Sequence, residues 1–168
     1  MSQNTQNGQK ILVLGVGNIL YTDEGVGVRA VEKLQAEYDF SDNVELMDGG
    51  TLGSKLIYPI TQSDYLIVVD AVLGGDEPGS IYRLTGDDLR KSLAFNNSLH
   101  DTDLVDTLIV CGMVDKQPEA VIIGIEPKDY STMSIELSED TAKVLPRVAE
   151  IVLNEITQAG GSYTPKTQ

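Results

Sequence analysis

The sequence contains few of the residues on which nucleophilic catalysis commonly depends: its 168 residues include one cysteine and one histidine. Cys111 cannot form an internal disulfide, and its apolar setting, "LIVCGM", predicts a packed side chain rather than an activated thiolate. The histidine, His100, lies beside Ser98 and Asp101 on one short stretch, and residues so close in sequence rarely adopt the geometry of a catalytic triad. There is no G-x-S-x-G motif and no H-E-x-x-H motif, which argues against the common serine hydrolases and helix-borne zinc proteases.

Positive charge is also scarce, because twelve lysines and arginines face twenty-six aspartates and glutamates, giving a net charge of -14. Such a field repels phosphate backbones and anionic lipid surfaces, so we expect neither a nucleic-acid partner nor a membrane partner. No apolar run approaches the roughly 20 residues that span a bilayer. The start, "MSQNTQNGQK", lacks the apolar region of a secretory signal. These features predict a cytoplasmic protein.

The stretch "GVGNILYTDEGVG", residues 15–27, is rich in glycine but lacks the signature of a nucleotide-binding loop. Leu20 occupies the place of the third glycine of a dinucleotide fingerprint, and no G-K-[ST] sequence follows. Asp23 and Glu24 place negative charge where a phosphate would need positive potential. We expect the glycines to permit a tight turn from strand to helix and a close approach of that helix to its neighbours.

Short apolar segments alternate with helical patterns along the chain, which predicts an α/β fold: a three-layer domain with a mostly parallel twisted sheet and helices on both faces. We expect a single domain over residues 1–168, with an ordered core at about 10–156 and frayed polar ends. The strands are expected at 10–15, 44–48, 65–70 and 120–125. Helices are expected from about Val28 to Tyr38, from Leu52 to Ile60 with Pro59 ending the helix, and over 104–109. A last helix is expected from Ser138, where Pro146 should kink the helix or mark its true start.

Residues 74–103 interrupt this alternation, with only a short strand expected at about 80–84. A long irregular excursion in a compact domain is commonly functional or disordered.

Ligands of open parallel sheets bind beyond the carboxyl ends of the strands, so polar residues that follow strands are candidate site residues. Such residues here are Asp23, Glu24, Asp48, Asp70 and His100. Two carboxylates and an imidazole at one edge could bind nickel or zinc and leave positions open for substrate. Each residue also has a purely structural interpretation, such as complementing a helix N-terminus or hydrogen-bonding a turn.

Several blocks, in this order along the chain, resemble those of the hydrogenase maturation endopeptidases over roughly residues 10–156. The most specific is "GVGNILYTDEGVGV" at 15–28. The others are "DGGTLG" (48–53), "VVDAV" (68–72), "PGSI" (78–81), "SLH" (98–100), "GIEP" (124–127) and the "LS" before the final helix.

The resemblance implies an endopeptidase that removes the C-terminal extension of a nickel-loaded nickel-iron hydrogenase large-subunit precursor. It also implies that Glu24, Asp70 and His100 contact nickel, which the precursor carries and the resting protease need not hold. The resemblance assigns no catalytic residue. A carbonyl polarised by the metal and a water activated by it are both possible routes to peptide cleavage.

Two other functions share features of this sequence. A non-catalytic nickel-binding maturation chaperone could use the same three ligands, and a precursor-cleavage assay would distinguish it from a protease. Peptidyl-tRNA hydrolase also has a G-x-G-N turn, but the net charge of -14 and the absence of a basic patch argue against tRNA binding.

Overall fold

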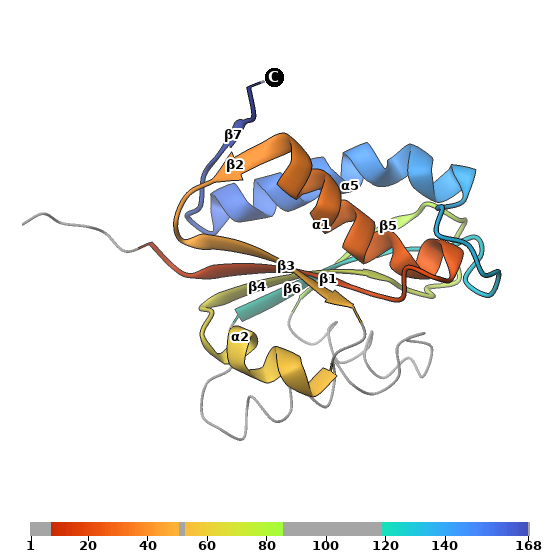
Figure 1. Cartoon of the computed structure of the whole chain (residues 1–168), viewed down its shortest axis with the longest axis horizontal. Coiled ribbons are helices and arrows are strands. Elements are labelled where there is room, and N and C mark those ends of the chain that lie inside the picture. The colour runs from red at the N-terminus through yellow and green to blue at the C-terminus, as the bar shows by residue number, and fades with distance from the viewer. Residues whose placement is uncertain (1–7, 51–52, 86–118, 168) are drawn as a thin grey trace, which may run out of the picture.

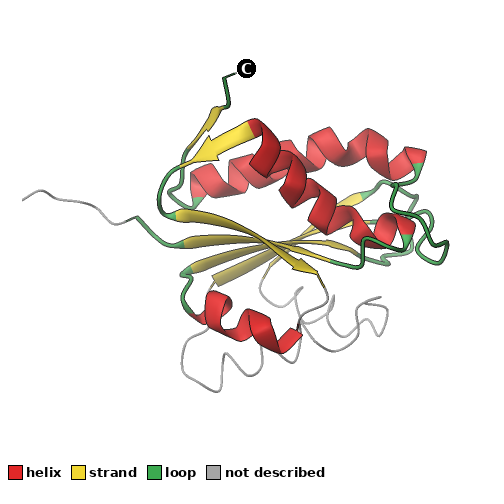
Figure 2. Ribbon diagram, viewed as in Figure 1, coloured by secondary structure: helices red, strands yellow, loops and turns green. Residues whose placement is uncertain are grey.

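The structure is a computed structural model that describes residues 8–50, 53–85 and 119–167. Its main sheet has the strand order β3-β1-β4-β6-β5, in which β5 runs antiparallel to β6 and the other neighbours are parallel. The predictions of an α/β fold and a mostly parallel sheet are therefore confirmed (Figure 2). The strands are β1 (Ile11–Val16), β3 (Val44–Gly50), β4 (Tyr65–Ala71), β5 (Ile81–Thr85) and β6 (Glu119–Ile125).

Alternate residues of the central strands point to opposite faces of the sheet, and each face packs against different helices. On one face, residues such as Val13 and Ile67 share a core with α1 (Val26–Glu37) and α5 (Glu139–Gln158). On the other face, Leu14 and Val68 pack with residues of α2 (Ile57–Thr61) and the turn before it. Figure 1 shows α1 and α5 above the sheet and α2 below it. Because these strands are buried on both faces, their sequences are continuous apolar runs.

Proline does not end α2, contrary to the expected stop at Pro59. A 3-10 turn over Gly53–Leu56 precedes the helix, and Pro59 is the third residue of Ile57–Thr61. The first N–H groups of a helix have no partner within it, so a proline there removes no helical hydrogen bond. The predicted helix is present, but Pro59 was wrongly interpreted as its end.

Helix α5 begins where the sequence predicts, because Ser138 is its N-cap and accepts a hydrogen bond from the N–H of Thr141. Glu139 and Asp140 in the first turn complement the helix dipole. Pro146 lies inside the helix and therefore does not mark its start.

The C-terminal residues continue beyond the expected core. Strand β7 (Tyr163–Pro165) pairs antiparallel with β2 (Tyr38–Phe40), next to the end of α1. The rings of Tyr38 and Tyr163 meet edge to face with centroids 5.3 Å apart. This aromatic contact gives an otherwise polar segment something to pack against.

Three sequence predictions, His100, Cys111 and the helix at 104–109, lie outside the described residues. Among the described helices, none combines the length and apolar character that a membrane crossing requires.

Candidate active site

The end of β1 and the start of α1 meet the end of β4 at very close range. Strands β1 and β4 are neighbours, with Gly15 paired to Val69. A side chain at Gly27 would overlap the backbone carbonyls of Val69 and Val16, and one at Gly15 would overlap the backbone of Gly27. The predicted reason for these glycines is thus confirmed: only residues without a Cβ allow the first turn of α1 to lie directly on the sheet.

Asp70 lies at the carboxyl end of β4, one residue beyond the point where β4 pairs with β1. Its side chain is buried, with 7% of the residue exposed, and Oδ1 accepts a hydrogen bond of 2.8 Å from the N–H of Ala71. A buried carboxylate is costly unless hydrogen bonds or a cation compensate its charge. Asp70 is therefore placed and oriented at the sheet edge where ligands of such folds bind.

Glu24 lies in η1, a 3-10 turn over Thr22–Gly25 that connects β1 to α1. It is half-buried, and its N–H donates to the carbonyl of Tyr21 at 3.1 Å. Thr22, two residues earlier, has a φ of 51°, in the left-handed region that β-branched residues rarely adopt. Such strain persists where the surroundings fix the backbone, and it is often found at functional sites.

Hydrogen bonds to the loop before α5 fix this strained residue. The N–H of Thr22 donates to the carbonyl of Ser134 at 2.9 Å, and its hydroxyl donates to the carbonyl of Thr132 at 2.7 Å. The backbone conformation that presents Glu24 therefore depends on residues more than a hundred positions away in sequence.

Asp23 is fully buried and links η1 to the same part of the chain. Its Oδ2 accepts hydrogen bonds from the N–H groups of Lys128 and Asp129 at 3.0 and 3.1 Å, and from the hydroxyl of Ser138 at 2.7 Å. Its Oδ1 accepts a further bond of 2.8 Å from the N–H of Ser138. Four donors compensate the buried charge. Asp23, which the sequence grouped with Glu24 as a candidate site residue, is used to hold the turn in place.

Glu126 is a second buried carboxylate that fixes a loop at this edge. It follows β6, is 5% exposed, and accepts hydrogen bonds from the N–H groups of Gly74 and Gly75 at 2.7 and 2.9 Å. It was not among the candidate site residues, although the rule that selected Asp70, an acidic residue at the end of an apolar strand, would also have selected Glu126.

Asn18 and Asp48 stabilise the turns in which they lie. The side-chain oxygen of Asn18 accepts a hydrogen bond of 3.0 Å from the N–H of Leu20. Oδ1 of Asp48 accepts one of 2.9 Å from the N–H of Gly50, whose φ is 48°. These are the local bonds that Asn and Asp side chains commonly make in turns.

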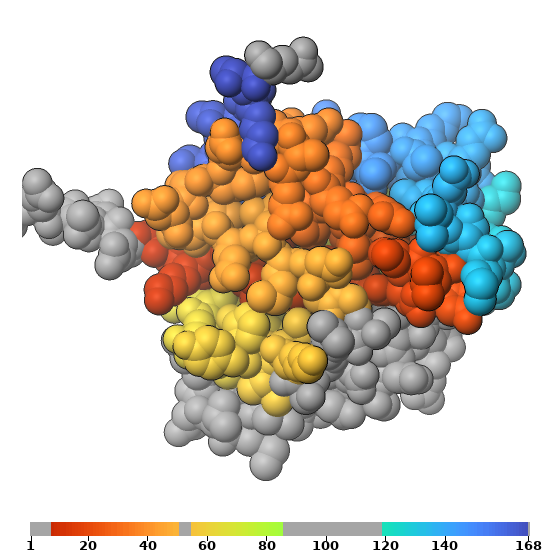
Figure 3. All heavy atoms as spheres, viewed as in Figure 1, coloured from red at the N-terminus to blue at the C-terminus, as the bar shows by residue number. Residues whose placement is uncertain are grey.

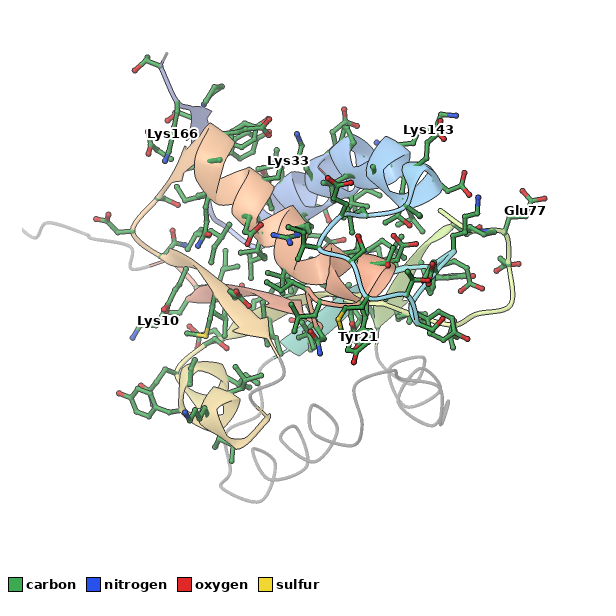
Figure 4. All side chains as sticks on the ribbon, turned by 45° about the vertical axis from the view of Figure 1, so that its right-hand side comes forward. Lys10, Tyr21, Lys33, Glu77, Lys143 and Lys166 are labelled. Atoms are coloured by element: carbon green, nitrogen blue, oxygen red, sulfur yellow. The ribbon has the colours of Figure 1, made fainter. Side chains whose placement is uncertain are left out.

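The structure thus places two of the three predicted nickel contacts, Glu24 and Asp70, at the carboxyl edges of neighbouring strands. Figure 4 shows Tyr21 at this edge, below the start of α1 and next to the loop that follows β6. The third predicted contact, His100, lies outside the described residues, and the described part of the chain holds no group of three potential metal ligands.

Comparison with known proteins shows the family of this chain. The sequence profile described as "Hydrogenase maturation protease" matches residues 28–155. The chain belongs to the hydrogenase maturation protease family. It is similar to the hydrogenase 2 maturation protease of Escherichia coli, with 33% identity over 159 residues that cover 94% of this chain and 96% of that protein.

The protease also resembles the hydrogenase expression/formation protein HupM of Azotobacter chroococcum, at 37% identity over 164 residues, covering 96% of this chain and 78% of the relative. Among solved structures, the hydrogenase maturating endopeptidase HybD from E. coli superposes with a TM-score of 0.88 at 33% identity, covering 94% of this chain and 98% of that one. The protease is accordingly a hydrogenase maturation endopeptidase.

Proposed function

We propose that this protease removes the C-terminal extension of a nickel-iron hydrogenase large-subunit precursor after nickel has been inserted. In this proposal Glu24, Asp70 and His100 contact the nickel, which belongs to the precursor and is therefore part of the substrate. The observation that carries the proposal is the placement of Glu24 and Asp70 at one edge of the sheet, on elements with little freedom to move.

The chemistry of these donors fits the metal. Carboxylate oxygens and a neutral imidazole nitrogen suit borderline divalent ions such as nickel, and three protein contacts leave positions for groups of the precursor. The two carboxylates also favour a cation electrostatically, in a protein whose net charge is -14. The same charge opposes binding to nucleic acid or anionic membranes, and we propose a cytoplasmic location on this basis.

Other residues of the chain hold this site in shape. Asp23 fixes the turn that carries Glu24, and Glu126 fixes the loop at 74–75, close in sequence to Asp70. Little reorganisation is then needed when the precursor arrives, which favours recognition of one particular arrangement of ligands around the metal.

Incubation of the purified protease with nickel-loaded and nickel-free precursor, followed by mass measurement of the products, tests the proposal. We expect loss of the C-terminal extension from the nickel-loaded precursor only. Equal cleavage of both would contradict recognition through nickel. Binding of the nickel-loaded precursor without cleavage would instead indicate a maturation chaperone.

A further inference from the structure

Four large apolar side chains are exposed beside the site. Met133 is 73% exposed, Ile135 64% and Tyr130 38%, all in the loop of residues 127–137 that connects β6 to α5. Leu20, in the segment after β1, is 49% exposed. Figure 3 shows this loop, in cyan, against the segment that follows β1, in red-orange. Apolar residues gathered on one surface more often mark a binding site than do isolated ones.

The loop is held rigidly, although its apolar side chains face solvent. Oδ1 of Asp129 accepts hydrogen bonds from the N–H groups of Ser131 and Thr132, both at 3.0 Å. Hydrogen bonds from the side chain of Thr132, then from its backbone and that of Ser131, lower the pKa of the Asp129 carboxyl. The guanidinium of Arg29 on α1 donates to the carbonyl of Ile135 at 2.9 Å. The exposure of this surface is thus fixed by the fold.

The loop is joined directly to the segment that carries Glu24. Ser134 forms a parallel bridge with Tyr21, and its N–H donates to the carbonyl of Leu20 at 2.8 Å. In that register Met133 is the neighbour of Leu20, and Ile135 the neighbour of Thr22.

The distances place this surface within reach of any large substrate bound at the site. Bridged residues lie about 5 Å apart, and Tyr21 and Glu24 close a turn whose ends are less than about 7 Å apart. The backbones of Ser134 and Glu24 therefore lie within about 12 Å of each other in space. A protein interface buries about 800 Å² on each partner, which is the area of a disc roughly 16 Å in radius. A folded precursor centred on Glu24 would extend over this loop.

We infer that Leu20, Tyr130, Met133 and Ile135 form a docking surface for an apolar surface of the hydrogenase large-subunit precursor. This inference rests on the proposed function, since it takes the precursor as the partner. The surface contributes affinity through apolar burial, whereas Glu24 and Asp70 recognise the metal. Methionine suits such a role because its flexible, polarisable side chain adapts to the partner.

Lysine substitutions test the docking surface. Met133→Lys and Ile135→Lys place a charge on the surface without disturbing the core, since both side chains are exposed. Tyr58→Lys is the matched control, because Tyr58 is also 73% exposed but lies on α2, below the sheet and away from this loop (Figure 1). For cleavage of nickel-loaded precursor, we expect each docking variant to raise KM about tenfold with kcat nearly unchanged, and the control to match wild type. Thermal melts should agree for all of them.

Unchanged KM in both docking variants, with active wild type, would overturn the docking surface. A fall in kcat at constant KM would overturn it too, because the residues would then act on the reaction itself. Sedimentation of the same proteins adds a third possibility: a dimer that the substitutions dissociate, with KM unchanged, would mean that the surface binds a second copy instead.

If the proposed function is wrong, the wild-type protein does not cleave the precursor, which differs from every outcome above. Calorimetric binding of nickel-loaded precursor to wild type and to the docking variants would still decide the inference. Weaker binding by Met133→Lys and Ile135→Lys, but not by Tyr58→Lys, supports it, and equal binding overturns it.

Discussion

Ser138 donates two hydrogen bonds to the buried carboxylate of Asp23, one from its N–H to Oδ1 at 2.8 Å and one from its hydroxyl to Oδ2 at 2.7 Å. The two residues are 115 positions apart in sequence. Ser138 is also the N-cap of α5, so a single contact fixes both the start of the final helix and the turn that presents Glu24. The geometry of the site is thereby coupled to the packing of the last helix.

Asp23→Asn should destabilise the protein by about 3 kcal/mol. The amide keeps one acceptor oxygen, but its NH2 group faces donors that previously bonded the second carboxylate oxygen. Urea unfolding measures the loss. Asp42→Asn, at an exposed position, is the control and should behave like wild type. At temperatures where Asp23→Asn remains folded, cleavage should still be reduced because Glu24 loses its support. Identical unfolding curves for the two variants would contradict the structural role of Asp23.

Asp70→Asn and Glu24→Gln should each impair cleavage of nickel-loaded precursor at least tenfold, because both keep an acceptor oxygen but lose the charge that favours a cation. Asp76→Asn is the comparison. Asp76 lies on the loop between β4 and β5, where it accepts a hydrogen bond of 2.7 Å from the hydroxyl of Tyr82. Its substitution should change activity little. Thermal melts control for folding. Wild-type activity in Asp70→Asn would end the metal-recognition proposal.

Gly27→Ala should destabilise the protein by about 3 kcal/mol, although alanine is ordinarily the better helix former. The added methyl group would overlap the carbonyls of Val69 and Val16, so the start of α1 must move away from the sheet. Thermal unfolding measures the cost, and activity should fall with it because η1 precedes this turn. A melting temperature equal to or above that of wild type would mean that the backbone can yield at no cost.

Tyr82 should make the protein sensitive to alkali. Burial, the hydrogen bond to Asp76 and the nearby charges of Glu126 and Asp76 raise its pKa from 10.0 to about 12. The unfolded chain ionises first, so this contribution to stability is complete below pH 10 and is lost as pH rises toward 12. Urea unfolding across this range should show a steeper decline for wild type than for Tyr82→Phe. Parallel declines would show that Tyr82 has an ordinary pKa in the folded protein.

The sequence by itself determined the parts of this protein that depend on local pattern. Apolar runs such as 65–70 predicted the buried strands, the acidic first turn predicted the start of α5, and Gly27 predicted the close approach of α1 to its neighbours. These predictions succeeded because periodicity, capping and the absence of a Cβ act over a few residues. The order of blocks from 15 to 138 also carried the resemblance to the family, which the comparisons confirmed.

Only the tertiary structure decided what the acidic residues at the sheet edge do. Asp23 and Glu24 are adjacent in sequence, yet Asp23 is fully buried against Lys128, Asp129 and Ser138 whereas Glu24 is half-buried at the edge. Glu126 resembles Asp70 in sequence context, yet it binds the N–H groups of a loop. A carboxylate acquires its role from the donors that surround it, and those donors come from segments that only folding brings together.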